Sequence, residues 1–510
     1  MVENIAQTIQ NLKKVFRTGV SKPVAWRKHQ LRQLRKGILE MEIQMAAANK
    51  EDLDNTPFQT KFFSTNPCIW DIDFTIEHLD EFAKDVTVDT PLAFAPAKSK
   101  VRYEPLGVAV IYGSWNYPFL VTLKPLVQAI AAGNLAILKP SEMAERSSAV
   151  IKAIVEKYLD KDCFAVIEGG PEVCIELQKH HVDLICFTGS TQKGRMVAEA
   201  AGKHLTPCIL ELGGKCPAVI DIGCNLDLAI SKICMARYMN SGQTCISTDY
   251  VLVHESMKDQ FLNDLQLKLK EQYGEHPNGS QDQGKIICDW HCDRIKKLID
   301  TSGGKIICGG RVDRDVKYIE PTVIVNPEID SPLMQEEIFG PVLPVLTWNK
   351  IEDVIEFINN KDKPLAVYYF GPYMRNTANR ERLMNETSSG AFVQNDVMIH
   401  MLNHGFGFGG VGPSGYGRYG GYDGFKMWSN PKSVMCKPGL NFYPLNQLAP
   451  PFTQQKQDLI KKLLKIKGQQ STLIFWTILV FVLITFGILI GVFYREIFSG
   501  IQLGCRSIIE

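Results

Sequence analysis

Four short apolar runs constrain the fold of this chain more than any other feature of its sequence. Each run ends in a glycine-rich or polar turn, helical stretches separate them, and they occupy residues 108–112, 135–138, 164–167 and 184–187. Strands that are apolar throughout are covered on both faces, and an intervening helix returns the chain so that the next strand lies parallel to the last. The pattern therefore predicts βαβ units around a mostly parallel sheet, in the α/β class.

The flanking regions extend this prediction. The first eighty residues alternate apolar and charged positions at helical spacing, as at Leu31, Leu34 and Ile38, and predict surface helices. Residues 216–395 again alternate strand and helix patterns, which predicts a second α/β domain. A chain of 510 residues is long enough for two or three domains.

The composition excludes several classes of protein. Charged residues make up 22% of the chain and apolar residues 45%, which is ordinary globular usage and excludes a disordered or fibrous chain. A net charge of +1 gives no field that would attract a nucleic acid. The 14 cysteines are scattered through apolar segments, and the N-terminus lacks the apolar core of a secretory signal. Both features favour a reducing, cytosolic compartment.

Residues 472–494 contain no charge and predict a transmembrane helix. Such a helix would be about 34 Å long, enough for a hydrocarbon core of roughly 30 Å. The alternative is a buried helix of a soluble core, but such helices seldom run so long without polar residues.

The segment at 454–467 predicts an amphipathic basic helix, with leucines and isoleucines on one side and lysines largely on the other. Lysines that precede the span favour a single-pass C-terminal tail anchor with the folded body on the cytosolic side of the endoplasmic reticulum or another organelle membrane. The alternative is a solvated helix that only links body and anchor.

Three residues have the chemistry of a catalytic site. Cys245 follows a small turn at Gly242, where backbone N–H groups could lower the pKa of the thiol and face a developing oxyanion. Glu211 ends an apolar run, and the glycines at 213 and 214 would leave room beside this potential base. Asn116 follows the first predicted strand and could donate to an oxyanion. Alone, each is more often a structural residue.

Residues 189–194 have the spacing G-x-x-x-x-G, but Arg195 and Met196 replace the Lys-Ser/Thr of a P-loop, so a nucleoside triphosphatase is not expected. The dinucleotide fingerprint G-x-G-x-x-G is also absent, and an ordinary strand-to-helix turn is the alternative. His291 lies between Cys288 and Cys292, but further ligands at suitable spacing are not evident, and no metal is predicted.

Taken together, the motifs SWNYP, LKPSE, FTGST, ELGGK, GQTC and QEEIFGP resemble the aldehyde dehydrogenase superfamily in order and spacing, over about residues 1–445. The NDV segment at 395–397 with His400, and the FGGVGPSGYG run from Phe408, resemble its class 3 branch, which includes the membrane-anchored fatty aldehyde dehydrogenases.

The resemblance implies Cys245 as nucleophile, Glu211 as the base for hydrolysis, and Asn116 with the Cys245 backbone N–H as the oxyanion hole. Lys124 matches a family lysine near the active site. The implied cofactor is NAD, with NADP possible, and it would be held by Lys139, Glu142, Gly189, Ser190, Gly194, Glu337 and Phe339.

The resemblance also implies a domain plan and a homodimer. The cofactor domain, a variant Rossmann fold, would comprise 1–82 and 104–210, the catalytic domain 211–396, and the bridging or oligomerisation segments 83–103 and 397–445. The expected reaction oxidises hydrophobic, medium- to long-chain aldehydes to acids through a thiohemiacetal and a thioester on Cys245. The alternatives are a CoA-acylating dehydrogenase, which generally lacks the hydrolytic acid present here as Glu211, and a non-catalytic membrane scaffold.

Overall fold

The computed structural model describes residues 4–94, 96–275, 277, 280, 282–372, 378–439, 449–465 and 468–506. The chain forms two compact units: Met1–Ala83 with Glu104–Asn430, and Lys84–Tyr103 with Pro431–Glu510. The predicted cofactor and catalytic domains both fall in the first unit, and the boundary at residue 210 stays a prediction.

The first unit contains a six-stranded sheet in which the four predicted apolar runs are all strands, with the order β17-β7-β6-β3-β4-β5. Five of these strands are parallel, and the edge strand β17 is antiparallel to β7. The bounds are β3 (Val108–Tyr112), β4 (Leu135–Lys139), β5 (Phe164–Val166), β6 (Leu184–Gly189), β7 (Cys208–Leu212) and β17 (Gly415–Tyr416). The α/β prediction is confirmed.

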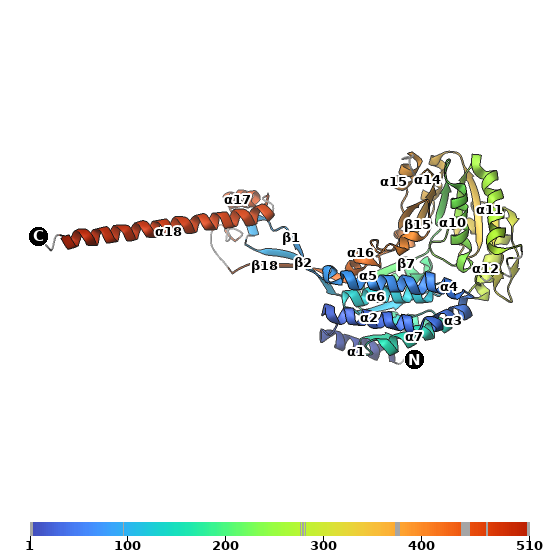
Figure 1. Ribbon diagram of the computed structural model, residues 1–510, viewed down its shortest axis with the longest axis horizontal. Coiled ribbons are helices and arrows are strands. Elements are labelled where there is room, and N and C mark those ends of the chain that lie inside the picture. The colour runs from blue at the N-terminus through green and yellow to red at the C-terminus, as the bar shows by residue number, and fades with distance from the viewer. Residues whose placement is uncertain are drawn as a thin grey trace. The chain divides into compact units, whose positions relative to one another are not determined.

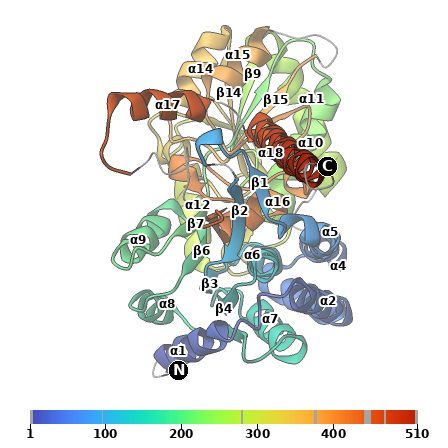
Figure 2. The same ribbon diagram turned by 90° about the vertical axis from the view of Figure 1, so that its left-hand side faces the viewer.

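Helices cover both faces of this sheet, as Figure 2 shows: α8 and α9 lie on one side, and α2, α6 and α7 on the other. Every residue of α6 is buried, because the helix lies between the sheet and the N-terminal helices. The bounds are α1 (Ile5–Arg17), α2 (Val24–Glu40), α3 (Glu42–Leu53), α4 (Pro57–Thr60), η2 (Lys61–Thr65), α5 (Asn66–Phe82), α6 (Pro118–Ala132), α7 (Glu145–Tyr158), α8 (Pro171–Gln178) and α9 (Thr191–Gly202).

A seven-stranded sheet in the same unit has the order β10-β13-β14-β9-β8-β15-β16 and is parallel except for β10. Helices α10 and α11 lie on one side of it, and α14 with α15 on the other (Figure 1). The bounds are β8 (Pro217–Ile220), α10 (Leu226–Tyr238), β9 (Tyr250–His254), α11 (Lys258–Tyr273), α12 (Asp289–Asp300), β10 (Lys305–Cys308), β13 (Thr322–Val325), α13 (Pro332–Gln335), β14 (Val342–Trp348), α14 (Ile351–Asn359), β15 (Ala366–Phe370), α15 (Ala378–Glu386) and β16 (Ala391–Gln394).

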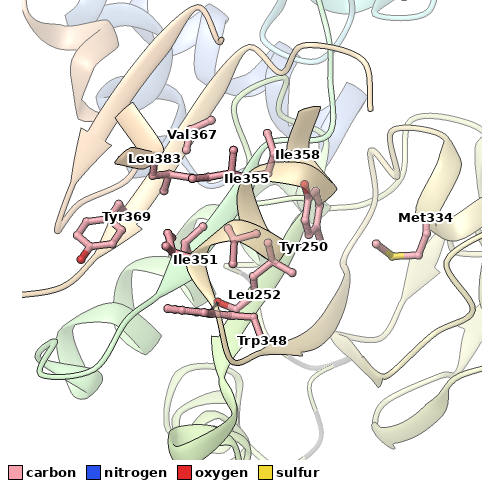
Figure 3. Packing of buried hydrophobic residues seen from close by; sticks show 12 residues of the cluster. Tyr250, Leu252, Met334, Trp348, Ile351, Ile355, Ile358, Val367, Tyr369 and Leu383 are labelled. Atoms are coloured by element: carbon pink, nitrogen blue, oxygen red, sulfur yellow. Dashed lines mark hydrogen bonds between the residues drawn. The ribbon is translucent and has the colours of Figure 1, made fainter. Parts of the chain in front are cut away.

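The packing of α14 explains how this second sheet is stabilised. Ile351, Ile355 and Ile358 recur at helical spacing and point onto Leu252 of β9 and its neighbours, as Figure 3 shows. Each fully buried side chain of this size contributes roughly 1.5–3 kcal/mol by leaving water. The sheet therefore forms a rigid support for the loops at the carboxyl ends of its strands.

The second unit contains a three-stranded sheet in the order β1-β2-β18 and two C-terminal helices. Its elements are β1 (Val86–Val88), η3 (Leu92–Phe94), β2 (Lys98–Pro105), β18 (Ser429–Cys436), α17 (Gln454–Lys465) and α18 (Gly468–Arg506). Helix α17 coincides with the predicted amphipathic helix up to Lys465, and positions 466 and 467 lie outside the described residues.

Among the described residues, one helix is long and apolar enough to cross a membrane. The apolar stretch of this helix is Val480–Phe498, which has 19 residues, a mean hydropathy of 2.0 and no buried residues. This stretch overlaps the predicted 472–494, and most side chains of 472–479 lie outside the described residues. By length and composition, α18 fits a membrane anchor.

Candidate active site

Three of the predicted cofactor and base residues lie where strands of the six-stranded sheet end. Strand register pairs Tyr112 with both Lys139 and Phe187, and pairs Thr188 with Glu211. The parallel strands therefore end together, and Lys139, Gly189 and Glu211 lie at their carboxyl ends, where α/β folds bind ligands.

Cys245 lies on a tightly folded loop between η4 (Met239–Gly242) and β9. Asn240 and Ser241 both have φ near 53°, and Gly242 has φ of 72°. A Cβ at Gly242 would lie 2.4 Å from the Gly340 carbonyl oxygen, so only glycine fits there. The Gln243 amide closes the turn by donating to the carbonyls of Asn240 and Lys285, at 2.9 and 3.0 Å.

Asn116 is bound directly to this loop. Its Nδ2 donates to the Gln243 carbonyl at 3.1 Å, and its own carbonyl accepts from Asn240 Nδ2 at 2.9 Å. Beside it, the hydroxyls of Tyr117 and Thr244 are hydrogen-bonded at 2.9 Å. The structure thus brings together two segments that the sequence separates widely, and the Asn116 amide lies next to the cysteine segment.

The acidity of the Cys245 thiol differs from the sequence expectation. Burial, with a smaller contribution from Glu337 and Glu211, raises its pKa to about 12, although the backbone N–H groups of Cys245 and Ile246 lower it. The expected effect of the backbone is present but is outweighed, because a partly buried thiolate beside carboxylates is poorly solvated and repelled. In the ligand-free protein the thiol is protonated at neutral pH.

Glu211 is buried inside β7, with 3% of its surface exposed. Among the described residues neither of its carboxylate oxygens has a hydrogen-bond partner. Burial holds the pKa of this carboxyl well above its usual range, although Arg418 and Lys124 lower it. A carboxyl of raised pKa that is free to accept a proton has the properties of a general base.

A glycine outside the ELGGK motif lies close to Glu211. A Cβ at Gly409 would lie 3.0 Å from Glu211 Oε1, whereas a Cβ at Gly213 would lie 1.9 Å from Glu337 Oε2. Gly213 makes room for the carboxylate of Glu337 from a distant segment, and the prediction that the ELGGK glycines leave room beside Glu211 stays a prediction.

Glu337 lies near a buried ionic network that the sequence motifs did not reveal. Lys215 Nζ pairs with Asp249 at 2.6 Å, and Arg237 pairs with the other oxygen of Asp249 at 3.2 Å. Burial and Asp249 raise the pKa of Glu337 to about 8, whereas the Gly214 N–H, Arg294 and Lys215 lower it. The lysine of ELGGK was the available signal, since buried charges need partners.

Phe339 follows Glu337 in a left-handed conformation with φ of 47°. Its ring packs edge to face on Trp115, with centroids 5.3 Å apart. Trp115 belongs to the same segment as Asn116, so this contact joins the two sheets of the first unit beside the cysteine loop.

The other predicted cofactor residues lie on or just after β4, on β6 and at the start of α9. Lys139 is buried, and its Nζ lies 2.6 Å from Oε2 of the half-exposed Glu142. Gly189 ends β6, and Ser190 caps α9 by accepting from the Lys193 N–H at 3.4 Å. Gly194 lies within α9, where a Cβ would meet Leu212 Cδ2 at 2.6 Å, so close packing onto β7 accounts for this glycine.

A cavity of about 220 Å³ connects Asn116, Thr244 and Cys245 with a wall of mostly apolar side chains. Helix α6, the turn η2 and the segment η7 (Ile399–Leu402) supply much of this wall. Among its residues are Phe62, Phe63, Leu120, Val121, Met401 and Leu402. Phe62 is 39% exposed, so the cavity reaches the surface beside it.

The fold and the site define a class: an α/β protein in which an apolar cavity, with Cys245 in its wall, lies beside the carboxyl ends of parallel strands. Comparison with known proteins supports this class. The model of the aldehyde dehydrogenase family matches residues 2–434. Aldehyde dehydrogenase family 3 member A2 of Rattus norvegicus is 41% identical, over 88% of this chain and 92% of its own. The dimeric NADP-preferring aldehyde dehydrogenase of Canis lupus familiaris is 39% identical, over 88% and 98%.

Solved structures show the same likeness. A substrate-bound state of Staphylococcus aureus AldH matches with a TM-score of 0.86 and 37% identity, over 90% of this chain and 99% of its own. PnpE in complex with nicotinamide adenine dinucleotide matches with a TM-score of 0.78 and 25% identity, over 87% and 91%.

The chain belongs to the aldehyde dehydrogenase family. It is an NAD(P)-dependent enzyme that oxidises aldehydes to carboxylic acids, and the CoA-acylating alternative is not favoured. The resemblance read from the motifs is confirmed, as is the family 3 branch.

Proposed function

We propose that this aldehyde dehydrogenase oxidises medium- to long-chain fatty aldehydes, with Cys245 as the covalent nucleophile. The observation that carries the proposal is the position of Cys245 in the wall of an apolar cavity, beside the Asn116 amide. Such a wall favours an alkyl chain by about 0.8 kcal/mol for each buried CH₂ group. The amide supplies the polar contact that an aldehyde oxygen needs.

In the proposed mechanism the Cys245 thiol first loses its proton to solvent, the thiolate forms a bond to the aldehyde carbon, and the carbonyl oxygen takes the negative charge. Asn116 Nδ2 and the Cys245 N–H stabilise this oxyanion. Once the carbon reaches the oxidation level of an acid, it is held on Cys245 as a thioester. Glu211 then removes a proton from water, the water oxygen attacks the thioester carbon, and Cys245 leaves as thiolate.

The described residues fit a dinucleotide cofactor. The N-terminus of α9 follows Gly189 and Ser190 and suits a pyrophosphate, because its first N–H groups are free of intrahelical partners. The adjacent Lys139 and Glu142 suit a ribose, and Glu337 with Phe339 suits the second ribose. A bound nicotinamide cofactor supplies the hydride acceptor for the reaction. Glu142 would repel a 2′-phosphate, so NAD is the proposed preference and NADP the alternative.

The proposed cellular form is a homodimer anchored by α18. One described C-terminal helix fits a membrane anchor, and lysines precede it in α17, which favours a cytosolic catalytic body on an organelle membrane such as the endoplasmic reticulum. The canine relative is named as dimeric, which supports a dimer here.

The test of the nucleophile is Cys245→Ala, with Cys308→Ala as a matched cysteine control in β10. Cys245→Ala should reduce aldehyde-dependent NADH formation more than about a thousandfold, because no covalent capture remains. Cofactor binding, followed by fluorescence quenching, should stay near wild type. Cys308→Ala should retain activity, and substantial turnover by purified Cys245→Ala would exclude the proposed role.

A further inference from the structure

Lys124 is a charged residue in the wall of the otherwise mostly apolar cavity. It lies on the cavity face of α6 together with Tyr117, Leu120 and Val121, at spacings of three, four and seven residues from Tyr117. Only 4% of its surface is exposed. Side chains on a helix lean towards its N-terminus, which for α6 is the end next to Asn116.

The hydrogen-bonding capacity of Lys124 is largely unused. Its Nζ donates to the Met401 carbonyl at 3.2 Å and lies 5.9 Å from the centre of the Tyr419 ring. An ammonium group has three N–H donors, and among the described residues no carboxylate forms an ion pair with it. The other lysine of the cavity wall, Lys232, is paired with Asp396 at 2.9 Å.

A buried charge without a counterion is unfavourable. Glu211 is close enough for its acidity to respond to Lys124, yet both Glu211 oxygens are without a hydrogen-bond partner among the described residues. The cation and the carboxylate therefore do not satisfy each other. Lys124 presents free donors to a cavity whose other walls suit an alkyl chain.

We propose that Lys124 is an anion-binding point of the substrate cavity and holds the carboxylate of an acid with an apolar chain. This inference rests on the proposed function, because the chain of the acid would occupy the same cavity as the chain of the aldehyde. The reaction itself releases such an acid. Above pH 8, where Glu337 is ionised, Glu337 near Cys245 would repel this carboxylate, and Lys124 offsets that repulsion. Acid product should therefore compete with aldehyde for the cavity.

The experiment measures how well hexanoate and 1-hexanol protect Cys245 of the full-length protein in lipid vesicles from iodoacetamide. Alkylation is followed by mass spectrometry at pH 9, without cofactor or turnover, and 1-hexanol serves as the uncharged ligand of equal chain length. A charge-assisted contact should make hexanoate about tenfold or more effective than 1-hexanol. In Lys124→Gln the two ligands should protect equally well, and Lys124→Arg should keep most of the advantage of hexanoate.

Lys232→Gln is the matched control, because it removes a cavity lysine that already has a carboxylate partner; its ratio should stay near that of wild type. Equal protection by both ligands in wild type, or an unchanged ratio in folded Lys124→Gln, would overturn the proposal, and the wild-type measurement decides even if the variant fails to fold. Full aldehyde oxidation by Cys245→Ala would instead remove the proposed function while leaving the protection ratio intact.

Discussion

Cys245, Glu211 and Glu337 are close enough for each carboxylate to raise the pKa of the thiol. The ligand-free site is therefore held in its protonated, unreactive form, with the pKa of Glu337 itself raised to about 8. Such coupling keeps a nucleophile inert until the charge balance of the site changes.

This coupling predicts how Cys245 reacts with iodoacetamide in the ligand-free enzyme. With a pKa of about 12, the thiolate fraction rises about tenfold for each pH unit between 9 and 10, where Glu337 is already ionised. At pH 9 Glu337 is ionised, so Glu337→Gln removes a negative charge, lowers the pKa of Cys245 and should raise the alkylation rate several-fold. Glu336→Gln, at the more exposed neighbouring residue, should leave the rate unchanged, and an equal effect of both variants would contradict the coupling.

A second residue-level prediction separates capture from hydrolysis. Glu211→Gln keeps the shape of the side chain but removes the proposed base, so the thioester on Cys245 should accumulate when the variant is mixed with hexanal and NAD. Intact-protein mass spectrometry should show an acyl adduct, and steady-state turnover should fall about a hundredfold or more. An unmodified mass with wild-type turnover would exclude Glu211 as the base.

At the scale of elements, strand and helix positions followed from pattern, whereas the fine geometry of the loops did not. The run at 164–167 predicted β5 within one residue, because apolar runs bounded by turns have few other structures available. The motifs placed Asn116 and Cys245 in one site only through family resemblance. The left-handed Asn240 and Ser241, and the approach of Glu337 to Gly213, depend on contacts between distant segments and leave no local signal.

The cysteine loop gives a prediction at this scale. Gly242→Ala places a Cβ 2.4 Å from the Gly340 carbonyl oxygen at a φ of 72°, so the variant should lose about 1–3 kcal/mol of stability and most of its activity. Gly202→Ala, at the end of α9 where nothing lies within 4 Å of the added Cβ, should be neutral or slightly stabilising. Thermal unfolding of both variants checks this, and equal melting temperatures would contradict the constraint.

At the scale of the whole molecule, the site residues and the candidate span belong to different compact units. The family model ends at residue 434, and the Staphylococcus aureus structure is matched over 99% of its length, so the catalytic fold does not require the C-terminal helices. We therefore expect the tail to affect where the enzyme acts, and aldehyde oxidation can test this expectation.

Ending the chain at Ser471 removes the charge-free segment and should release the protein from membranes, while oxidation of a soluble short aldehyde stays near the full-length rate. Long-chain aldehydes partition into bilayers by about 0.8 kcal/mol per buried CH₂ group, so an anchored enzyme meets them at high local concentration. Truncation should therefore lower activity on vesicle-borne hexadecanal at least tenfold relative to hexanal, and further deletion of residues 454–467 should deepen that loss.

Assays of full-length and truncated enzyme with both aldehydes in liposomes measure the ratio of hexadecanal activity to hexanal activity. Equal ratios would show that the tail only localises the enzyme, and truncated protein that still sediments with vesicles would refute α18 as the anchor.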